Sequence, residues 1–281
     1  KRVIEAMCRI RCTAEVASEF RYENPIIGKK DMCIVISQSG ETADTLAAMR
    51  LAKQAGAFTI AIVNVVSSTI AREADGVLYT WAGPEISVAT TKAYSAQLSA
   101  LYLISVKIAR VRGLISIGDE RALCAELQRL PECIEQTLGC QSDMQRIATL
   151  YANRSSVFFL GRGLDYAAAL EASLKLKEIS YIHSEAYAAG ELKHGTISLI
   201  EEGTPVFAVA TQDKLFEKTL GNIKEVKARG ASVIALVTDK HASVSEFADE
   251  VIRVPSTYGN FLPSLNVIPL QIFAYYMAVL R

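Results

Sequence analysis

The sequence predicts an α/β protein made of two tandem copies of one domain, each a parallel sheet flanked by helices. The main reason is an internal repeat. When the sequence is shifted by 174 positions, the distance from Gly56 to Gly230, many identical or similar residues align without a gap. Short apolar runs rich in β-branched residues also alternate with segments of helical periodicity, which favours parallel strands with helical crossovers. The length of 281 residues suits two domains of roughly 150 residues each.

The first copy begins with the continuous apolar run Met32–Ile36, which predicts a strand buried on both faces. Thr42–Ala55 follows with helical periodicity and closes at Gly56, a residue typical of helix C-termini. The next predicted elements are a strand, a short helix and a strand, over Thr59–Val63, Ser68–Ala74 and Val77–Tyr79. This order indicates a parallel sheet with helices on both faces.

The second copy opens with a predicted strand over Val157–Leu160, a glycine turn at Gly161–Gly163 and a long helix that ends at Ser180. A strand, a helix and a strand follow over Pro205–Ala210, Leu215–Arg229 and Ser232–Val237. We therefore divide the chain into a first domain at 1–113, a helical linker at 114–149 with a break at Pro131, and a second domain at 150–281.

The repeat also suggests that the first copy is incomplete. The first strand and the glycine turn of the second copy have residue numbers below 174, the repeat distance. Their counterparts in the first copy would therefore lie before residue 1. We expect the first copy to lack its first strand, its first loop and the start of its first helix. The chain is then part of a longer polypeptide.

Composition excludes several classes of protein. The chain has 30 basic and 30 acidic residues and is 51% hydrophobic, which disfavours disorder and an electrostatic nucleic-acid surface. No apolar run approaches the 18 residues that a membrane span needs. The six cysteines have no histidine at ligand spacing, so neither a disulfide framework nor a zinc site is expected. These features predict a cytoplasmic protein without metal or membrane.

The segment Ser37–Thr42, SQSGET, lies between a predicted strand and a predicted helix. A helix N-terminus at the carboxyl end of a parallel sheet suits a phosphate, because its N–H groups and dipole favour an anion. Ser37, Ser39 and Thr42 can add hydroxyl donors, and Gly40 allows close approach. The alternative is that Ser39 merely caps the helix. The second copy has Asp213 at the matching place, so only the first copy should hold an anion.

Glu171, Lys175 and Glu178 are spaced by four and three residues, which places them on one face of the long helix. They form either a solvated salt-bridge stripe or the acid–base groups of a cleft, and the residues alone leave both open. Among the histidines, His194 precedes a glycine in a polar loop and is the better candidate for proton transfer.

For the other two histidines we expect structural roles. His183 follows Ile182 and is predicted to be packed, and His241 is predicted to lie in a surface turn. A metal site formed by His183, Glu185 and His194 is not expected, because the spacing matches no familiar motif.

Together these segments resemble the sugar-isomerase (SIS) domain pair of the glucosamine-6-phosphate synthase family, the glutamine:fructose-6-phosphate amidotransferases. The resemblance covers nearly the whole chain. The matching stretches are ISQSGETADT (Ile36–Thr45), PEISVATTKAY (Pro84–Tyr94), FLGRG (Phe159–Gly163), EASLKLKEISYIHSEAYAAGELKHG (Glu171–Gly195) and IPLQIFAYYMAVLR (Ile268–Arg281).

The resemblance implies conversion of fructose 6-phosphate toward glucosamine 6-phosphate without a cofactor. The residues implied to bind the substrate are Ser37, Gln38, Ser39 and Thr42 at the phosphate and Val88 and Thr90 at the sugar. Thr90 stands where the family often has serine. Glu178 would move the proton between C1 and C2, Lys175 and Glu171 would assist, and His194 would open the sugar ring. Because that histidine reaches the neighbouring subunit's site in the family, a homodimer is implied.

Three parts of the family pattern lie outside this sequence: the glutaminase domain, a further phosphate-binding serine loop before residue 1, and a Schiff-base lysine beyond Arg281. Two alternatives stay open, a stand-alone phosphosugar isomerase and a sugar-phosphate-sensing module.

Overall fold

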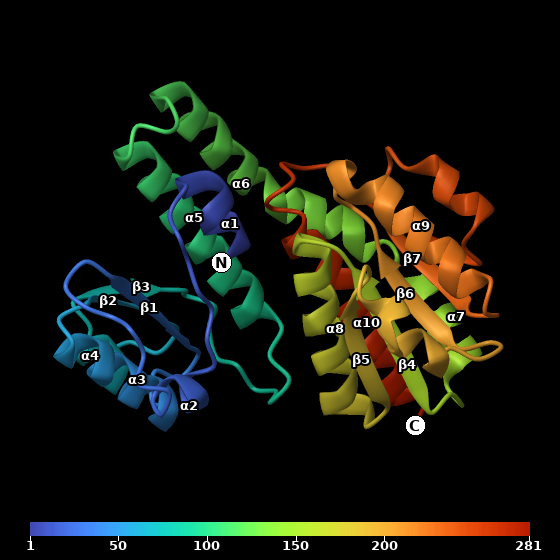
Figure 1. Ribbon diagram of the computed structural model, residues 1–281, viewed down its shortest axis with the longest axis horizontal. Helices are drawn as coiled ribbons and strands as arrows, with labels where there is room; N and C mark the ends of the chain where they lie inside the picture. Colours follow the sequence, from blue (N-terminus) through green and yellow to red (C-terminus); the bar gives the residue numbers. More distant parts are fainter. The chain divides into compact units, whose positions relative to one another are not determined.

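The computed structural model describes residues 1–281, which divide into two units, Lys1–Glu120 and Arg121–Arg281 (Figure 1). Each unit is built on its own parallel β-sheet flanked by helices, which confirms the predicted α/β class. None of the helices combines the length and the apolar character that crossing a membrane requires.

The sheet of the first unit has three parallel strands in the order β1-β2-β3. The strands are β1 (Met32–Ser37), β2 (Phe58–Val63) and β3 (Gly76–Tyr79). The helices are α1 (Arg2–Cys8), α2 (Ala17–Phe20), α3 (Ala43–Gln54), α4 (Thr69–Glu73) and α5 (Lys92–Val111). Successive residues of β2 face opposite sides of the sheet, so Ala61 packs with α3 and α4 whereas Ile62 packs with α5.

The prediction that the first strand is buried on both faces was wrong. Met32 and Ile36 are each 40% exposed, and only Val35 and Ser37 of β1 are buried. The reason is that β1 forms an edge of this sheet and pairs with β2 alone. The apolar run indicates a strand but does not indicate its place in the sheet.

The sheet of the second unit has five parallel strands in the order β5-β4-β6-β7-β8. The strands are β4 (Ser156–Gly161), β5 (His183–Ala188), β6 (Pro205–Val209), β7 (Ser232–Thr238) and β8 (Glu250–Val254). The α-helices are α7 (Gln141–Tyr151), α8 (Leu164–Ser180), α9 (Phe216–Lys227) and α10 (Pro263–Val279), and short 3₁₀ helices are η1 (Leu192–His194), η2 (Thr196–Leu199), η3 (Asp213–Leu215) and η4 (Ala242–Glu246).

Both faces of this sheet are covered. On one face, Ile223 and Val226 of α9 pack with Leu160 and Val206 in a large apolar cluster. On the other face, where α8 and α10 pack together, the ring of Phe207 stacks on Phe159 and is tilted against Phe273, with centroid distances of 5.3 and 4.5 Å. β4 and β6 are therefore buried on both sides, as their apolar runs predict.

Helix α6 (Ile117–Leu138) is continuous through Pro131, so the predicted break at this proline was wrong. A proline inside a helix costs about 3 kcal/mol. Side chains on both sides of it hold the helix in place: Leu130 and Cys133 are buried, and Arg129 donates to the carbonyl of Ser256 at 2.9 Å. Tertiary contacts thus outweigh the local preference.

Candidate functional site

Three hydroxyl groups gather at the turn between β1 and α3. The backbone N–H of Gly40 donates to Ser37 Oγ at 3.0 Å, and this oxygen lies 2.9 Å from Thr42 Oγ1. Ser39 Oγ accepts a hydrogen bond from the N–H of Glu41 at 3.2 Å. Ser37 is buried, whereas Thr42 is exposed at the open end of the helix. The structure therefore brings the predicted hydroxyls together in one turn.

The N-terminus of α3 is free of a side-chain cap. Thr42 occupies the N-cap position and its hydroxyl makes no capping bond, so the alternative that Ser39 serves as the helix cap does not hold. Asp44 in the first turn would repel an anion, but its carboxylate is paired with Arg21 at 2.7 Å. The positive end of the helix dipole is thus available to an anion.

The turn is also held rigidly by the neighbouring helix α4. The carbonyl of Gly40 accepts a hydrogen bond from Ile70 N–H at 3.0 Å, and Glu41 Oε1 accepts one from Thr69 N–H at 2.6 Å. The bond from Thr69 lowers the pKa of the Glu41 carboxyl below its usual value. The carbonyl of Gln38 accepts from Asn64 N–H at 3.1 Å. A turn pinned at three points needs little reorganisation to bind a ligand.

The two residues predicted to line the sugar lie in the loop between β3 and α5. Val88 is 97% exposed, and the hydroxyl of Thr90 is buried without a hydrogen-bond partner. Neither makes a hydrogen bond to the Ser37–Thr42 turn. Their predicted role remains a prediction.

The matching turn of the second copy is filled by its own carboxylates. Asp165, which is 1% exposed, accepts hydrogen bonds from the N–H groups of Thr211 and Gln212 at 2.9 and 3.2 Å. Burial raises the pKa of Asp165 to about 6. Asp213 is paired with Lys240 and His241 at 3.2 and 3.1 Å. These groups occupy donors that could otherwise bind a phosphate.

Glu171, Lys175 and Glu178 form a connected row on α8. Lys175 is 4% exposed, its Nζ lies 3.8 Å from Glu171 Oε1, and it donates to Glu178 Oε2. The alternative of a solvated stripe was wrong, because α8 packs against the sheet and α10 and this packing buries the lysine. Glu171 Oε1 has no hydrogen-bond partner, and burial raises the pKa of Glu171 to about 7.

This raised pKa predicts a pH-dependent stability. Because the folded chain holds the proton on Glu171 more tightly than the unfolded chain, the free energy of unfolding should fall as pH rises from about 4.5 to 7, by at most about 3 kcal/mol. In Glu171→Gln the part of this loss that Glu171 causes should disappear, whereas the part that Asp165 causes, whose pKa is also raised, should remain. Urea unfolding at pH 5 and pH 8 measures the difference from wild type. The exposed Glu246 supplies the control, and an equal pH dependence in wild type, Glu171→Gln and Glu246→Gln would contradict the prediction.

The histidines do not all lie where the sequence predicted. His194 is exposed at the end of η1. His183 is not packed: its side chain is 61% exposed, because it begins the edge strand β5. The ring of His241 follows a turn but is stacked on Phe216 at 3.9 Å, and its side chain is only 11% exposed. No group of residues in the structure has the arrangement of a metal site.

His194 and Glu178 lie at opposite ends of β5. Glu178 is near the C-terminal end of α8, just before β5 begins, whereas His194 follows the carboxyl end of β5. A strand of six residues is about 20 Å long. The structure therefore does not bring these two predicted catalytic groups together within one chain.

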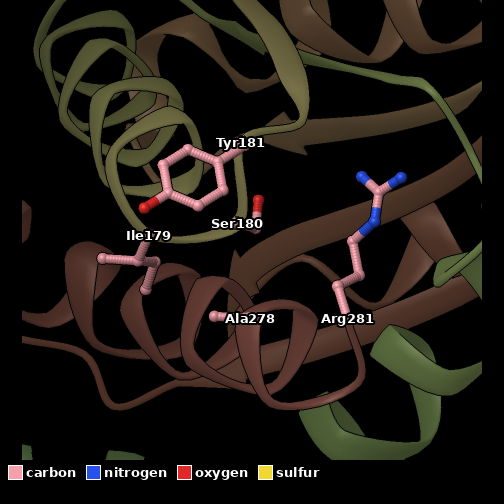
Figure 2. Close-up of a pocket in the computed structure, with 5 residues that line it drawn as sticks. All are labelled: Ile179, Ser180, Tyr181, Ala278 and Arg281. Atoms are coloured by element: carbon pink, nitrogen blue, oxygen red, sulfur yellow. The ribbon is translucent and has the colours of Figure 1, made fainter.

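A cavity that the sequence analysis did not predict lies between the C-terminal ends of α8 and α10 (Figure 2). Its volume is about 350 Å³, and one of its lining residues, Ile179, directly follows Glu178 in the sequence. Helix ends far apart in the sequence form it, so no local pattern could indicate it. The lining residues are Ile179, Ser180, Tyr181, Ala278 and Arg281.

Comparison with known proteins agrees with this architecture. Residues 1–107 and 150–281 match the family model of the SIS domain. The chain belongs to the SIS domain family. Within this family, the SIS domain pair described here corresponds to the C-terminal, isomerase part of the glutamine–fructose-6-phosphate aminotransferases.

Two relatives and one solved structure support this assignment. The isomerizing glutamine–fructose-6-phosphate aminotransferases of Caldanaerobacter subterraneus subsp. tengcongensis and Clostridium tetani are 56% and 53% identical over 279 residues, which make up 99% of this chain. The chain spans 46% of the length of each. The C-terminal domain of glucosamine-fructose-6-phosphate aminotransferase from Francisella tularensis is 37% identical with a TM-score of 0.95, and the match covers 100% of this chain and 80% of that one.

Proposed function

We propose that this SIS domain pair binds fructose 6-phosphate and catalyses its ketose-to-aldose isomerisation, as part of an enzyme that makes glucosamine 6-phosphate. The uncapped, hydroxyl-lined N-terminus of α3 carries the proposal, because it offers a phosphate both N–H groups and the positive end of a dipole. The names of the relatives supply the identity of the substrate.

In this proposal the Ser37–Thr42 turn binds the phosphate group. Ser39 and Thr42 donate hydroxyl hydrogen bonds to phosphate oxygens, while Ser37 orients Thr42 through their 2.9 Å contact. Gln38 lies in the same turn and adds its side-chain amide. Val88 and Thr90 line the sugar when the loop between β3 and α5 lies over the substrate.

The proton transfer is assigned to the row on α8. Glu178 removes the proton from C1 of the open ketose and returns it to C2, while the O1 proton moves to O2. The carbonyl group thereby moves from C2 to C1, and no atom is gained or lost. Lys175 is held beside Glu178 and stabilises the negative charge that develops on oxygen. Glu171, whose pKa is raised to about 7, keeps Lys175 in position and can hold a proton at neutral pH.

His194 opens the sugar ring, and we propose that it does so in the neighbouring subunit of a homodimer. The separation of His194 from Glu178 along β5 supports this arrangement, since one chain alone does not unite them. The other proposed partner is a glutaminase domain that supplies ammonia. The balanced charge and the composition support a cytoplasmic location.

Fructose 6-phosphate should bind the chain and raise its thermal unfolding temperature, and Ser39→Ala with Thr42→Ala should abolish the effect. Each hydrogen bond to a charged acceptor contributes about 1.5–3 kcal/mol, so each lost hydroxyl should weaken binding by about tenfold or more. Calorimetric titration measures the dissociation constant.

Thr149→Ala on the exposed face of α7 is the control and should leave binding unchanged. Unaltered affinity in the double variant would refute the phosphate site. In a polypeptide extended to the length of its relatives, binding without solvent deuterium exchange at C1 would instead indicate a sensing module.

A further inference from the structure

Arg162 occupies the middle of the glycine turn between β4 and α8, at the carboxyl end of the second sheet. Its Nε and Nη2 donate to the same amide oxygen of Asn222 on α9, at 3.1 and 2.9 Å. Asn222 is itself 5% exposed and donates to Glu225 Oε2 at 2.9 Å. The guanidinium is therefore held in one orientation by a buried side chain from another element.

The guanidinium lies directly against Gly190. A Cβ atom at this position would be 3.0 Å from both Nη1 and Nη2 and 3.2 Å from Cζ of Arg162. Gly190 has no positive φ angle, so the backbone conformation does not demand glycine there. A side chain at this position would therefore require the guanidinium of Arg162 to move.

Gly190 begins the segment that carries His194. On one side, Ala189 is buried and its N–H donates to the carbonyl of Gly161 at 2.9 Å. On the other side, Leu192 is fully buried and begins η1, which ends at His194. Between these two anchors, the backbone passes over the guanidinium of Arg162.

A purely structural contact does not require a charge here. Arg162 is half-buried, and it donates both of these hydrogen bonds to the neutral amide of Asn222. This partner does not compensate the positive charge of the guanidinium as a carboxylate would. Desolvating an arginine is unfavourable, and an apolar side chain would fill the same space without that penalty. An apolar side chain cannot replace the planar guanidinium group, which donates to Asn222 with one edge and lies flat against Gly190.

We propose that Arg162 is a positioning residue, which sets the path of the Gly190–Gly195 segment and so the direction in which His194 points. The role assigned to His194 rests on the proposed function; the positioning itself does not. Loss of the guanidinium should leave the fold and the phosphate turn intact and displace His194.

The first test measures positioning without any substrate. In Arg162→Met, amide hydrogen exchange over residues 189–195 should be faster than in wild type by about tenfold or more, while exchange in β4 stays unchanged. Arg154 is a matched control, because its guanidinium also lies against a glycine, Gly203. Arg154 precedes β4, whereas Arg162 follows this strand. Arg154→Met should leave exchange over 189–195 unchanged. Unchanged exchange in Arg162→Met would overturn the proposal.

The second test separates His194 from the proton-transfer groups, in a polypeptide extended to the length of its relatives. Fructose 6-phosphate must be ring-opened, whereas 5-deoxyfructose 6-phosphate has no C5 hydroxyl and cannot form the ring. Arg162→Met should lower kcat for deuterium exchange into fructose 6-phosphate by about ten- to a hundredfold at little change in KM, because small misplacements of a catalytic group have effects of this size. Exchange into the deoxy compound should change less than about twofold.

Arg162→Lys, which keeps the charge but loses the fork, should behave like Arg162→Met. An equal loss on both substrates would overturn the proposal, since it would mean that Arg162 acts on the whole fold. If wild type exchanges neither substrate, the proposed function fails, and the amide-exchange result still decides whether Arg162 positions the segment.

Discussion

Replacing Glu178 with glutamine is expected to lower the rate of proton exchange at C1 of fructose 6-phosphate by about 10²–10⁴-fold, the usual contribution of a general base. Glutamine keeps the size of the side chain and a hydrogen bond to Lys175, but it cannot accept the proton. Because the Ser37–Thr42 turn, which is the proposed phosphate site, lies in the other unit of the chain, the affinity for fructose 6-phosphate should stay the same. Solvent deuterium incorporation and calorimetric titration measure the two quantities.

Glu185→Gln is the matched control for this change. Glu185 is also a partly exposed glutamate of the second unit, but it lies on β5 and pairs with His183 at 3.4 Å. Its replacement should alter the exchange rate by less than about threefold. If Glu178→Gln exchanged deuterium as fast as wild type, another group would have to be the base.

Replacing Gly40 with alanine is expected to abolish phosphate binding, with a loss of affinity of about a hundredfold or more. An alanine Cβ would lie 2.0 Å from Ser68 Oγ and 2.5 Å from Ser68 Cβ, so the turn would have to move. Gly40 also has a φ angle of 68°, which costs a residue with a side chain about 1–2 kcal/mol. Together with the clash, we expect a destabilisation of about 2–4 kcal/mol.

Titration with fructose 6-phosphate and urea unfolding measure these two effects. In the background Ser68→Gly, the clash is removed but the strain of the positive φ angle remains, so Gly40→Ala should then destabilise by only about 1–2 kcal/mol. Gly118→Ala in helix α6 is the control and should be neutral or slightly stabilising, because its Cβ has an ordinary contact of 3.5 Å. Full affinity in Gly40→Ala would show that the phosphate does not bind at this turn.

Much of the secondary structure could be predicted because its signals are local. The periodicity over Thr42–Ala55 predicts α3 to within one residue at each end, and the apolar run Pro205–Ala210 predicts β6 equally well. The errors concern properties that depend on distant residues. The sequence around Pro131 does not indicate that Arg129 is bound to Ser256, so the continuity of α6 could not be predicted.

The candidate site likewise has features that local sequence signals predicted and features that depend on distant residues. Ser37, Ser39, Gly40 and Thr42 are nearly consecutive, so a strand followed by a helix is sufficient to bring them together. The spacing of Glu171, Lys175 and Glu178 likewise places them on one helix face. Whether such a row is solvated or buried depends on what packs on the helix, and the spacing left that question open.

The sequence by itself determined the repeated α/β architecture, the place of Ser37–Thr42 between a strand and a helix, and the common face of the three charged residues, because each follows from the period of a strand or helix. The tertiary structure alone decided that Lys175 is buried, that Asp165 fills the second turn and that Arg162 lies against Gly190. The physical reason is that burial and close approach depend on groups brought together from distant parts of the chain. Asp165 and Thr211 are 46 residues apart, and no local pattern relates them.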